Sequence, residues 1–315
     1  MARLTHELGI GRVIDIPDGL VAAQSSFNGE AGRAFVAGLP GLAERYLAQW
    51  GLRLDGAAMH GMCALVLPVV RVADGLPTVL KLQALDEETV GEPVALRAWG
   101  AAGVGAVGLL DHDPDTGALL LERLDEQRPL SRTADVRAAV GVLGEVLARL
   151  AAVPAPEGLR TLGAEAERML VAAPEAARTL ADASDRRLLA DCAAAVREVA
   201  GEPGDRLLHW DLHYDNVLSG RAGSERSGQW VAIDPKPLVG DPGFELFPAL
   251  VNLFDAGEVL WRFDALTDAL GMAGDRARAR AWTLGRVLQN ALGAVGDGER
   301  PSADQAGIAR QLLGR

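Results

Sequence analysis

Asp211 and Asn216, an aspartate and an asparagine five positions apart, have the residue types and spacing for chemistry in this sequence. A second aspartate, Asp234, follows a short apolar run, Trp230 to Ile233, which predicts a β-strand that ends at a carboxylate. A carboxylate can accept the proton of a hydroxyl group, and amide and carboxylate oxygens are ligands of Mg²⁺. These residues therefore predict phosphoryl transfer, which needs positioned charges and little covalent chemistry from the protein.

Two other interpretations of this stretch remain open. The string H-x-D-x-x-x-x-N, beginning at His209, could occur by chance, with His209 as a satisfied histidine of the core. Alternatively, His209, Asp211 and His213 alternate along the chain, so on a β-strand they would face one way and could bind a metal ion, as in a hydrolase. The hydrolase interpretation leaves Asn216 without a function.

The elements that position these residues differ between the two parts of the chain. The earlier part predicts a helix at 42–50 and another at 86–99, after residues 1–40 that wrap the outside. Strands are expected at 62–72, 78–82, 107–110 and 118–121, the first two joined by a turn at Asp74-Gly75. A polar connector at 125–133 leads to the later part.

The later part predicts mostly helices. They are expected at 136–150, 161–171, 175–183, 185–200, 243–254, 276–292 and 305–313. Val217-Leu218 and 230–233 predict the two arms of a hairpin, and residues 235–243 predict a rigid, turn-rich segment. Asp241 is expected to cap the helix at 243–254, with Pro242 in its first turn.

Lys81 lies inside an apolar strand, where a lysine must reach water or pair with an anion. Protein kinases place a lysine on such a strand to reach the nucleotide phosphates and pair it with a helix glutamate. We therefore expect Lys81 to contact phosphate, with Glu92, or Glu88 one turn earlier, as its partner. By their order along the chain, His60-Gly61 would cover the phosphates, and the strand end and connector at Glu122 and Leu124 would meet an adenine ring.

Composition limits the classes of function. The 315 residues carry a formal net charge of −12 and are 49% hydrophobic, as expected of a globular protein with an ample core. An acidic surface disfavours nucleic acid and anionic membranes as partners. Cys63 and Cys192 form no metal-binding pattern, and no apolar run is long enough for a signal segment or a membrane span. We expect a reduced, cytoplasmic monomer.

The order of these features resembles the aminoglycoside phosphotransferase superfamily, and more closely its streptomycin 6-phosphotransferase and hydroxyurea phosphotransferase branch. The likeness spans roughly residues 15–295. It is carried by the strings at 95–100, 109–113, 119–124, 208–218 and 232–242, and by Trp282-Thr283-Leu284 with Leu288-Gln289-Asn290.

This resemblance implies an α+β, protein-kinase-like bilobal fold. A small antiparallel-sheet lobe at 1–124 would bind the nucleotide, and a mostly helical lobe at 125–315 would hold the catalytic and substrate-binding residues. The cofactors implied are ATP and Mg²⁺. Asp211 would be the catalytic base, Asn216 and Asp234 the Mg²⁺ ligands, and Lys81 the phosphate ligand.

The substrate implied is a small-molecule antibiotic, with the 6-hydroxyl of streptomycin preferred and hydroxyurea or another small metabolite as the alternative. A planar guanidinium pairs bidentately with carboxylates, so Asp215, Glu245 and Asp255 are candidate substrate ligands. Residues on the helix at 276–292 could either contact the ligand or pack between helices, namely Trp282, Gln289 and Asn290. Pro-Lys after Asp234, in place of the Phe-Gly of protein kinases, argues against a mobile activation loop.

Overall fold

The computed structural model describes residues 14–314, which group into two compact units. Within the described residues, one unit comprises 14–85 together with Leu110–Arg123, and the other comprises Asp86–Leu109 and 124–314. The expected α+β architecture, with an antiparallel sheet followed by a mostly helical part, is confirmed. The change of unit after Arg123 adjoins the predicted division at residue 124, whereas Asp86–Leu109 groups with the helical unit.

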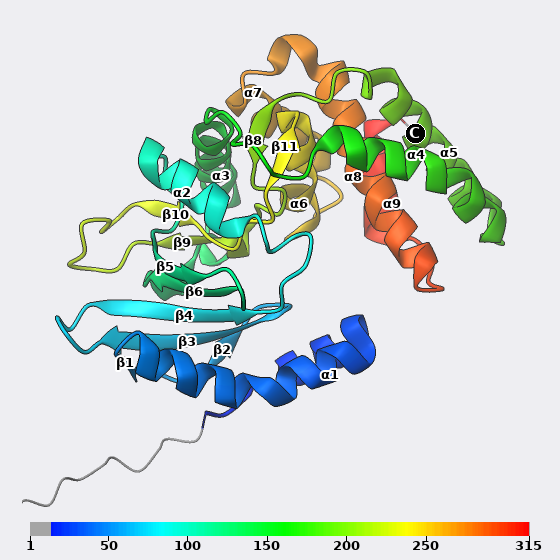
Figure 1. The fold of residues 1–315 in the computed structure, drawn as a ribbon. Helices are drawn as coiled ribbons and strands as arrows, with labels where there is room; N and C mark the ends of the chain where they lie inside the picture. The colour runs from blue at the N-terminus through cyan, green and yellow to red at the C-terminus, as the bar shows by residue number, and fades with distance from the viewer. Residues whose placement is uncertain (1–13, 315) are drawn as a thin grey trace, which may run out of the picture. The chain divides into compact units, whose positions relative to one another are not determined.

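The first unit is built on a six-stranded sheet (Figure 1). Its strands are β1 (Leu52–Leu54), β2 (Met59–His60), β3 (Ala64–Arg71), β4 (Pro77–Gln83), β5 (Leu109–Asp113) and β6 (Ala118–Glu122). Their order is β1-β3-β4-β6-β5, and β2 pairs with β3 beside β1. The predicted hairpin is confirmed, because β3 and β4 pair antiparallel. In the turn between them, the Asp74 carboxylate accepts a hydrogen bond from the Leu76 amide.

Helix α1 (Asp18–Gln49) covers one face of this sheet. The expectation that the chain up to residue 40 only wraps the outside is therefore wrong from Asp18 onward, and residues 1–13 lie outside the described part. The helix forms because its buried Leu39, Ala43 and Tyr46 recur at helical spacing. Gly29 interrupts it with a φ of 54°, a conformation that glycine adopts without strain.

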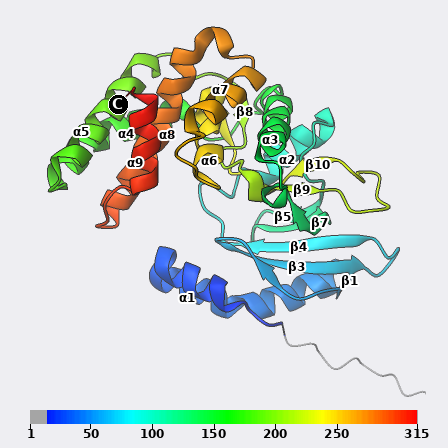
Figure 2. The ribbon, with the colours of Figure 1, turned by 180° about the vertical axis from the view of Figure 1, so that it is seen from behind.

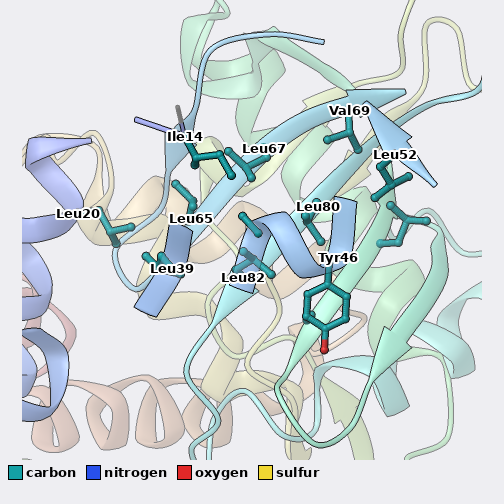
Figure 3. Close-up of a cluster of buried hydrophobic side chains, with 13 residues drawn as sticks. Ile14, Leu20, Leu39, Tyr46, Leu52, Leu65, Leu67, Val69, Leu80 and Leu82 are labelled. Atoms are coloured by element: carbon teal, nitrogen blue, oxygen red, sulfur yellow. The ribbon is translucent and has the colours of Figure 1, made fainter. Parts of the chain in front are cut away.

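The core of the first unit lies between α1 and the sheet (Figure 3). Leu65 and Leu67 of β3 and Leu80 and Leu82 of β4 point toward the helix. Side chains alternate between the faces of a strand, so Lys81, between Leu80 and Leu82, lies on the face that α1 does not cover.

The second unit consists mainly of helices, with two small antiparallel sheets (Figure 2). Its helices are α2 (Glu92–Ala102), η1 (Leu130–Arg132), α3 (Val136–Ala151), α4 (Leu162–Thr179), α5 (Ala183–Val199), η2 (Tyr214–Asn216), η3 (Pro242–Glu245), α6 (Leu246–Val251), α7 (Val259–Ala269), η4 (Ala273–Asp275), α8 (Arg276–Gly296) and α9 (Ala303–Leu312). Its strands are β7 (Asp125–Pro129), β8 (Arg206–Leu208), β9 (Val217–Ser219), β10 (Trp230–Ala232) and β11 (Leu238–Gly240). Helix α8 packs against α4, α5 and α9, while β9 pairs with β7 and β10, and β8 pairs with β11.

Four predicted helices differ from the observed ones for identifiable physical reasons. The helix expected from residue 86 begins at Glu92, because the Asp86 carboxylate accepts the amides of Glu88 and Thr89 and holds a turn there. The helices expected at 161–171 and 175–183 are one helix, α4, which continues through Pro174. The helix expected at 243–254 starts as the 3₁₀ turn η3, capped by Asp241 as predicted, and ends at Val251.

Two short strands lie where the sequence predicted turns or a connector. Strand β11 lies within the segment 235–243, and β7 lies within the connector 125–133. Each has three to five residues and pairs with a strand distant in the sequence, so local periodicity carries little signal for it. The hairpin arms predicted at 217–218 and 230–233 are β9 and β10.

Replacement of Leu80 by alanine tests the core of the first unit. Leu80 is completely buried between α1 and the sheet, so Leu80→Ala should lower the free energy of unfolding by about 3 kcal/mol, through lost burial and a residual cavity. Val72→Ala is the control, because Val72 is 66% exposed and should cost less than about 0.5 kcal/mol. Urea unfolding of both variants measures the difference, and equal stabilities would contradict this account of the core.

Candidate active site

The predicted base and the two predicted metal ligands converge through one β-hairpin of the second unit. The Ile233 amide donates to the Asn216 carbonyl at 2.9 Å, next to the pairing of Val217 with Ala232. Asn216 and Asp234 therefore lie at the same end of β9 and β10. The side-chain amide of Asn216 also donates to the backbone carbonyl of Asp211 at 2.9 Å. That bond closes the five-residue interval recognised in the sequence.

Two residues next to the predicted base and the hairpin have left-handed backbone conformations, which are costly for side chains other than glycine. They are Trp210, with a φ of 67°, and Asp234, with a φ of 58°. Trp210 is held by its amide, which donates to the buried Glu245 carboxylate at 2.6 Å. The guanidinium carbons of Arg160 and Arg286 lie 4.2 and 4.7 Å from the centroid of its indole. These contacts fix the residue that precedes the predicted base.

His209 is a buried structural histidine. Its Nε2 donates to the Ile233 carbonyl at 3.0 Å, and its ring stacks on Trp99. Burial lowers the pKa of His209 to about 4, so the ring is neutral at physiological pH. The core position of His209 is therefore confirmed, although its buried Nδ1 has no hydrogen-bond partner among the described residues.

The hydrolase interpretation is wrong, because the strand it requires does not form. Strand β8 ends at Leu208, and the left-handed Trp210 breaks the alternation of His209, Asp211 and His213. Between residues 14 and 314, no group of three or more His, Cys, Asp or Glu side chains could hold a metal ion.

Asn216 and Asp234 instead fit a magnesium ion that is shared with a nucleotide. Asn216 uses its amide nitrogen on the Asp211 carbonyl, so its side-chain oxygen is the atom left for a ligand. Mg²⁺ is typically held by one or two protein oxygens, with water and substrate phosphates in the other positions. An amide oxygen and a carboxylate from adjacent strand ends match that pattern.

Lys236 contacts the predicted base directly. Its Nζ lies 3.2 Å from Asp211 Oδ2 and 3.9 Å from Glu88 Oε2. Burial alone would lower the pKa of Lys236, but the carboxylates of Asp211, Glu88 and Asp234 raise it above its usual value. The ammonium is therefore charged and partly neutralises the carboxylate of Asp211.

A cavity of about 360 Å³ opens at Asp211. Its walls come from three segments: the loop at 209–216 that carries Asp211 (the catalytic loop of the proposed mechanism), α6 with the residues that follow it, and α8. The lining residues are Asp211, His213, Phe247, Pro248, Val251, Asn252, Leu253, Arg286 and Asn290. Burial lowers the pKa of Arg286 to about 10, so it stays cationic at neutral pH. A small molecule in this cavity would meet the Asp211 carboxylate, one guanidinium, polar amides and an apolar wall.

The three predicted substrate carboxylates do not line this cavity. Asp215 accepts a hydrogen bond from the lining residue Asn252 at 2.8 Å and so lies beside it. Glu245 is 1% exposed and holds the Trp210 amide, which assigns it a positioning role. Asp255 is exposed, and its carboxylate accepts the Gly257 amide in a turn.

The three predicted residues of α8 have different surroundings. Asn290 lines the cavity. Gln289 accepts a hydrogen bond from Arg286 at 2.7 Å and thereby orients it. Trp282 is completely buried and packs edge-on against Phe244, as a core residue does.

Sequence reasoning missed Arg286, Asn252 and Lys236 as site residues. Lys236 carried a usable signal, because it is a cation fixed between prolines two positions after Asp234. Arg286 and Asn252 carried none, since arginines are frequent in this chain and nothing local distinguishes these positions.

The predicted nucleotide-binding residues lie in both units. Lys81 is 5% exposed on β4, opposite Val66 of β3 and Leu119 of β6. His60 and Gly61 form the tip between β2 and β3, and the Gln24 side chain of α1 donates to the Cys63 carbonyl there at 3.0 Å. Glu122 ends β6 in the first unit, whereas Glu92 begins α2 and Leu124 is buried in the second unit.

The fold is shared with small-molecule kinases. A ternary complex of a thermostable variant of aminoglycoside phosphotransferase APH(4)-Ia with ADP and hygromycin B matches with a TM-score of 0.58 at 16% identity, over 86% of this chain and 96% of that one. APH(3'')-Id from Streptomyces rimosus, in complex with ADP and streptomycin, matches with a TM-score of 0.50 at 20% identity, over 80% and 98%. The chain therefore has the protein-kinase-like fold of these structures.

The chain belongs to the aminoglycoside/hydroxyurea antibiotic resistance kinase family, whose model matches residues 49–298. It is 60% identical to a hydroxyurea phosphotransferase of Kitasatospora aureofaciens over 97% of this chain and 88% of that protein. It is 51% identical to a streptomycin 6-kinase of Streptomyces glaucescens over 92% and 94%. The resemblance seen in the sequence is confirmed, and the protein is an O-phosphotransferase.

Replacement of Glu245 by glutamine tests the buried carboxylate beside the catalytic loop. Burial raises the pKa of Glu245 to about 7, whereas the ordinary value is 4.5. The folded state thus favours the protonated form, so this contribution to stability is complete below about pH 4.5 and is lost as pH rises through about 7. Between pH 5 and pH 8, wild type should lose about 2 kcal/mol of stability relative to Glu245→Gln.

Denaturant unfolding of both proteins at the two pH values measures this shift. Glu175→Gln is the matched control, because that side chain is 72% exposed and its stability difference from wild type should stay constant. A constant difference for Glu245→Gln as well would contradict the raised pKa.

Proposed function

We propose that this enzyme transfers the γ-phosphoryl group of ATP to a hydroxyl of an antibiotic, with the 6-hydroxyl of streptomycin as the preferred acceptor. The observation that carries the proposal is the position of Asp211. Its carboxylate lines a cavity for a small molecule. Its backbone carbonyl accepts a hydrogen bond from the side-chain amide of Asn216, which lies at the same strand end as Asp234. The proposed base for the acceptor and the proposed ligands of a nucleotide-bound Mg²⁺ thus lie in one hairpin and in the loop that precedes it.

The proposed reaction assigns one task to each of these residues. The acceptor hydroxyl loses its proton to the Asp211 carboxylate while its oxygen forms a bond to the γ-phosphorus. The bond from that phosphorus to the β–γ bridging oxygen breaks, and the electron pair leaves with ADP. Asn216 and Asp234 would hold Mg²⁺, which neutralises charge on the phosphates. Lys81 would contact the nucleotide phosphates.

Streptomycin as acceptor is supported by relatives and by charge. Two streptomycin 6-kinases, from Streptomyces glaucescens and Streptomyces griseus, share 51% and 50% identity with this chain over at least 90% of it. The net charge of −12 suits a cationic drug. Phosphorylation would add about −1.5 to −2 charges to the drug at neutral pH and so weaken its binding to polyanionic targets.

Hydroxyurea is the second candidate, and the lining of the cavity favours it. The cavity volume of about 360 Å³ suits a small acceptor, and Asp211 is the one carboxylate among its lining residues. The cationic Arg286 in its wall would attract a carbonyl oxygen and repel a guanidinium group. The relative at 60% identity phosphorylates hydroxyurea by its name.

We also propose that the enzyme acts as a cytoplasmic monomer, without nucleic acid or membrane as a partner. Cys63 and Cys192 are not joined in a disulfide, which suits a reducing compartment. The base, both proposed metal ligands and the cavity come from one chain. Among residues 14–314, no helix is long and apolar enough to cross a bilayer.

Incubation with ATP, Mg²⁺ and a panel of acceptors tests the proposed reaction. Mass spectrometry of streptomycin, hydroxyurea, kanamycin and viomycin should show one added phosphoryl group on streptomycin, and the tandem spectrum should place it on the 6-hydroxyl. Asp211→Asn should lower kcat at least about 100-fold, because the amide cannot accept the proton. Phosphorylation of hydroxyurea alone would select the second candidate, and no acceptor-dependent product would overturn the proposal.

Replacement of Lys81 tests the nucleotide side of the site separately. Lys81→Ala should raise the KM for ATP about tenfold, which corresponds to the loss of one charge-assisted hydrogen bond. The KM for the acceptor should stay within about threefold, because the acceptor cavity is lined by residues of the second unit. Steady-state kinetics with each substrate varied in turn distinguish the two effects. An unchanged KM for ATP would remove Lys81 from the proposed site.

A further inference from the structure

The sequence uses lysine very rarely. Of its 31 Lys and Arg residues only two are lysines, Lys81 and Lys236. Arginine serves even at interior positions such as Arg262 and Arg286. Arginine and lysine are not interchangeable, since a guanidinium is a planar fork and an ammonium is a compact charge with three donors. A lysine in such a chain therefore indicates a position that requires the ammonium.

Lys236 is fixed from both of its sides. Its backbone amide donates to the His209 carbonyl at 3.0 Å, which joins it to the start of the catalytic loop. Prolines flank it, and Pro237 packs so closely on Gly91 that a Cβ at Gly91 would lie 2.9 Å from the proline ring. The chain therefore places the Lys236 ammonium beside Asp211 with little freedom.

A second carboxylate supports the same ammonium. Glu88 Oε2 lies 3.9 Å from Lys236 Nζ, and Asp211 Oδ2 lies 3.2 Å from it. The turn that presents Glu88 is closed by Asp86, whose carboxylate accepts the amides of Glu88 and Thr89 at 2.8 Å each. The ammonium thus has a nearer partner, the proposed base Asp211, and a more distant partner, Glu88.

We propose that Lys236 is a further catalytic residue, which orients the Asp211 carboxylate and supplies positive charge to the phosphoryl group during transfer. This proposal rests on the proposed function of Asp211 as the base. Before transfer, the ammonium is partly neutralised by the Asp211 carboxylate. When that carboxylate takes the hydroxyl proton it becomes neutral, so the charge of the ammonium is free to stabilise oxygens of the phosphoryl group.

This arrangement stabilises the transition state more than the ground state, because the ammonium gains its new partner as the base loses charge. The consequence for kinetics is specific. Loss of Lys236 should lower kcat and leave the binding of both substrates nearly unchanged. Loss of Glu88 should have a smaller effect, since its oxygen lies 3.9 Å from the ammonium and its side chain is 43% exposed.

Three substitutions test the proposal. Lys236→Met removes the charge at similar length, Lys236→Arg keeps the charge in a planar group, and Arg178→Met removes an exposed cation paired with Glu175. For Lys236→Met we expect kcat to fall about 100-fold and KM for ATP and acceptor to stay within about threefold. Lys236→Arg should recover about tenfold of that loss, because charge returns without the ammonium geometry. Arg178→Met should match wild type.

Binding and coupling measurements separate this role from a structural one. Calorimetric titration of Lys236→Met with ADP and Mg²⁺ should give a Kd within about threefold of wild type. The double variant Asp211→Asn with Lys236→Met should be about as slow as Asp211→Asn alone, because the two groups act as a unit.

Two results would overturn the proposal. One is a kcat of Lys236→Met within about threefold of wild type, and the other is a weakening of nucleotide affinity as large as the fall in kcat. If Asp211→Asn is inactive and Lys236→Met is active, the inference about Lys236 alone fails. If Asp211→Asn is active, the proposed function fails with it.

Discussion

The site depends on one hydrogen bond, from the amide of Trp210 to the carboxylate of Glu245. A tryptophan with a φ of 67° is strained by on the order of 1–2 kcal/mol, so it keeps that conformation only when its surroundings determine it. Glu245 supplies the acceptor, and Arg160 and Arg286 stack on the indole. The left-handed residue turns the chain between β8 and η2, and this turn brings Asp211 to the wall of the cavity.

The cost of burying these charges is offset by their mutual arrangement. Burial raises the pKa of Glu245 and lowers the pKa of Arg286, so burying either charge without the other would be unfavourable. They lie in one network, in which Arg286 also opposes the charge of Asp211 and Glu88. Lys236 adds a second cation at Asp211. Lys236 and Arg286 thus place positive charge near the proposed base of an acidic chain, which suits a reaction that moves negative charge onto the acceptor.

Residues whose function depends on local order could be predicted from the sequence. The interval from Asp211 to Asn216 and the strand before Asp234 required only short-range patterns, and the structure brings these three residues together at one hairpin and the loop that precedes it. The hairpin of β3 and β4 and its lysine followed from alternation and a turn. Helix α1 was missed between residues 18 and 40, because its Gly and Pro residues disguise a helix whose apolar positions recur only when the whole segment is considered.

The lining of the cavity could not be predicted, because it depends on tertiary packing between distant segments. Asn252 follows α6, Arg286 lies on α8, and both reach the cavity only through the way these helices pack against the catalytic loop. Glu245 shows the same limit in the opposite direction. A carboxylate in a Pro-Gly-Phe-Glu turn is of a kind expected at the surface, where it could bind a ligand. The 3₁₀ turn η3 instead directs it inward to the backbone amide of Trp210, and the sequence cannot show that this amide needs an acceptor. The proposed acceptor cavity therefore depends on how α6 and α8 are placed, while the proposed base and metal ligands lie in a short stretch of chain.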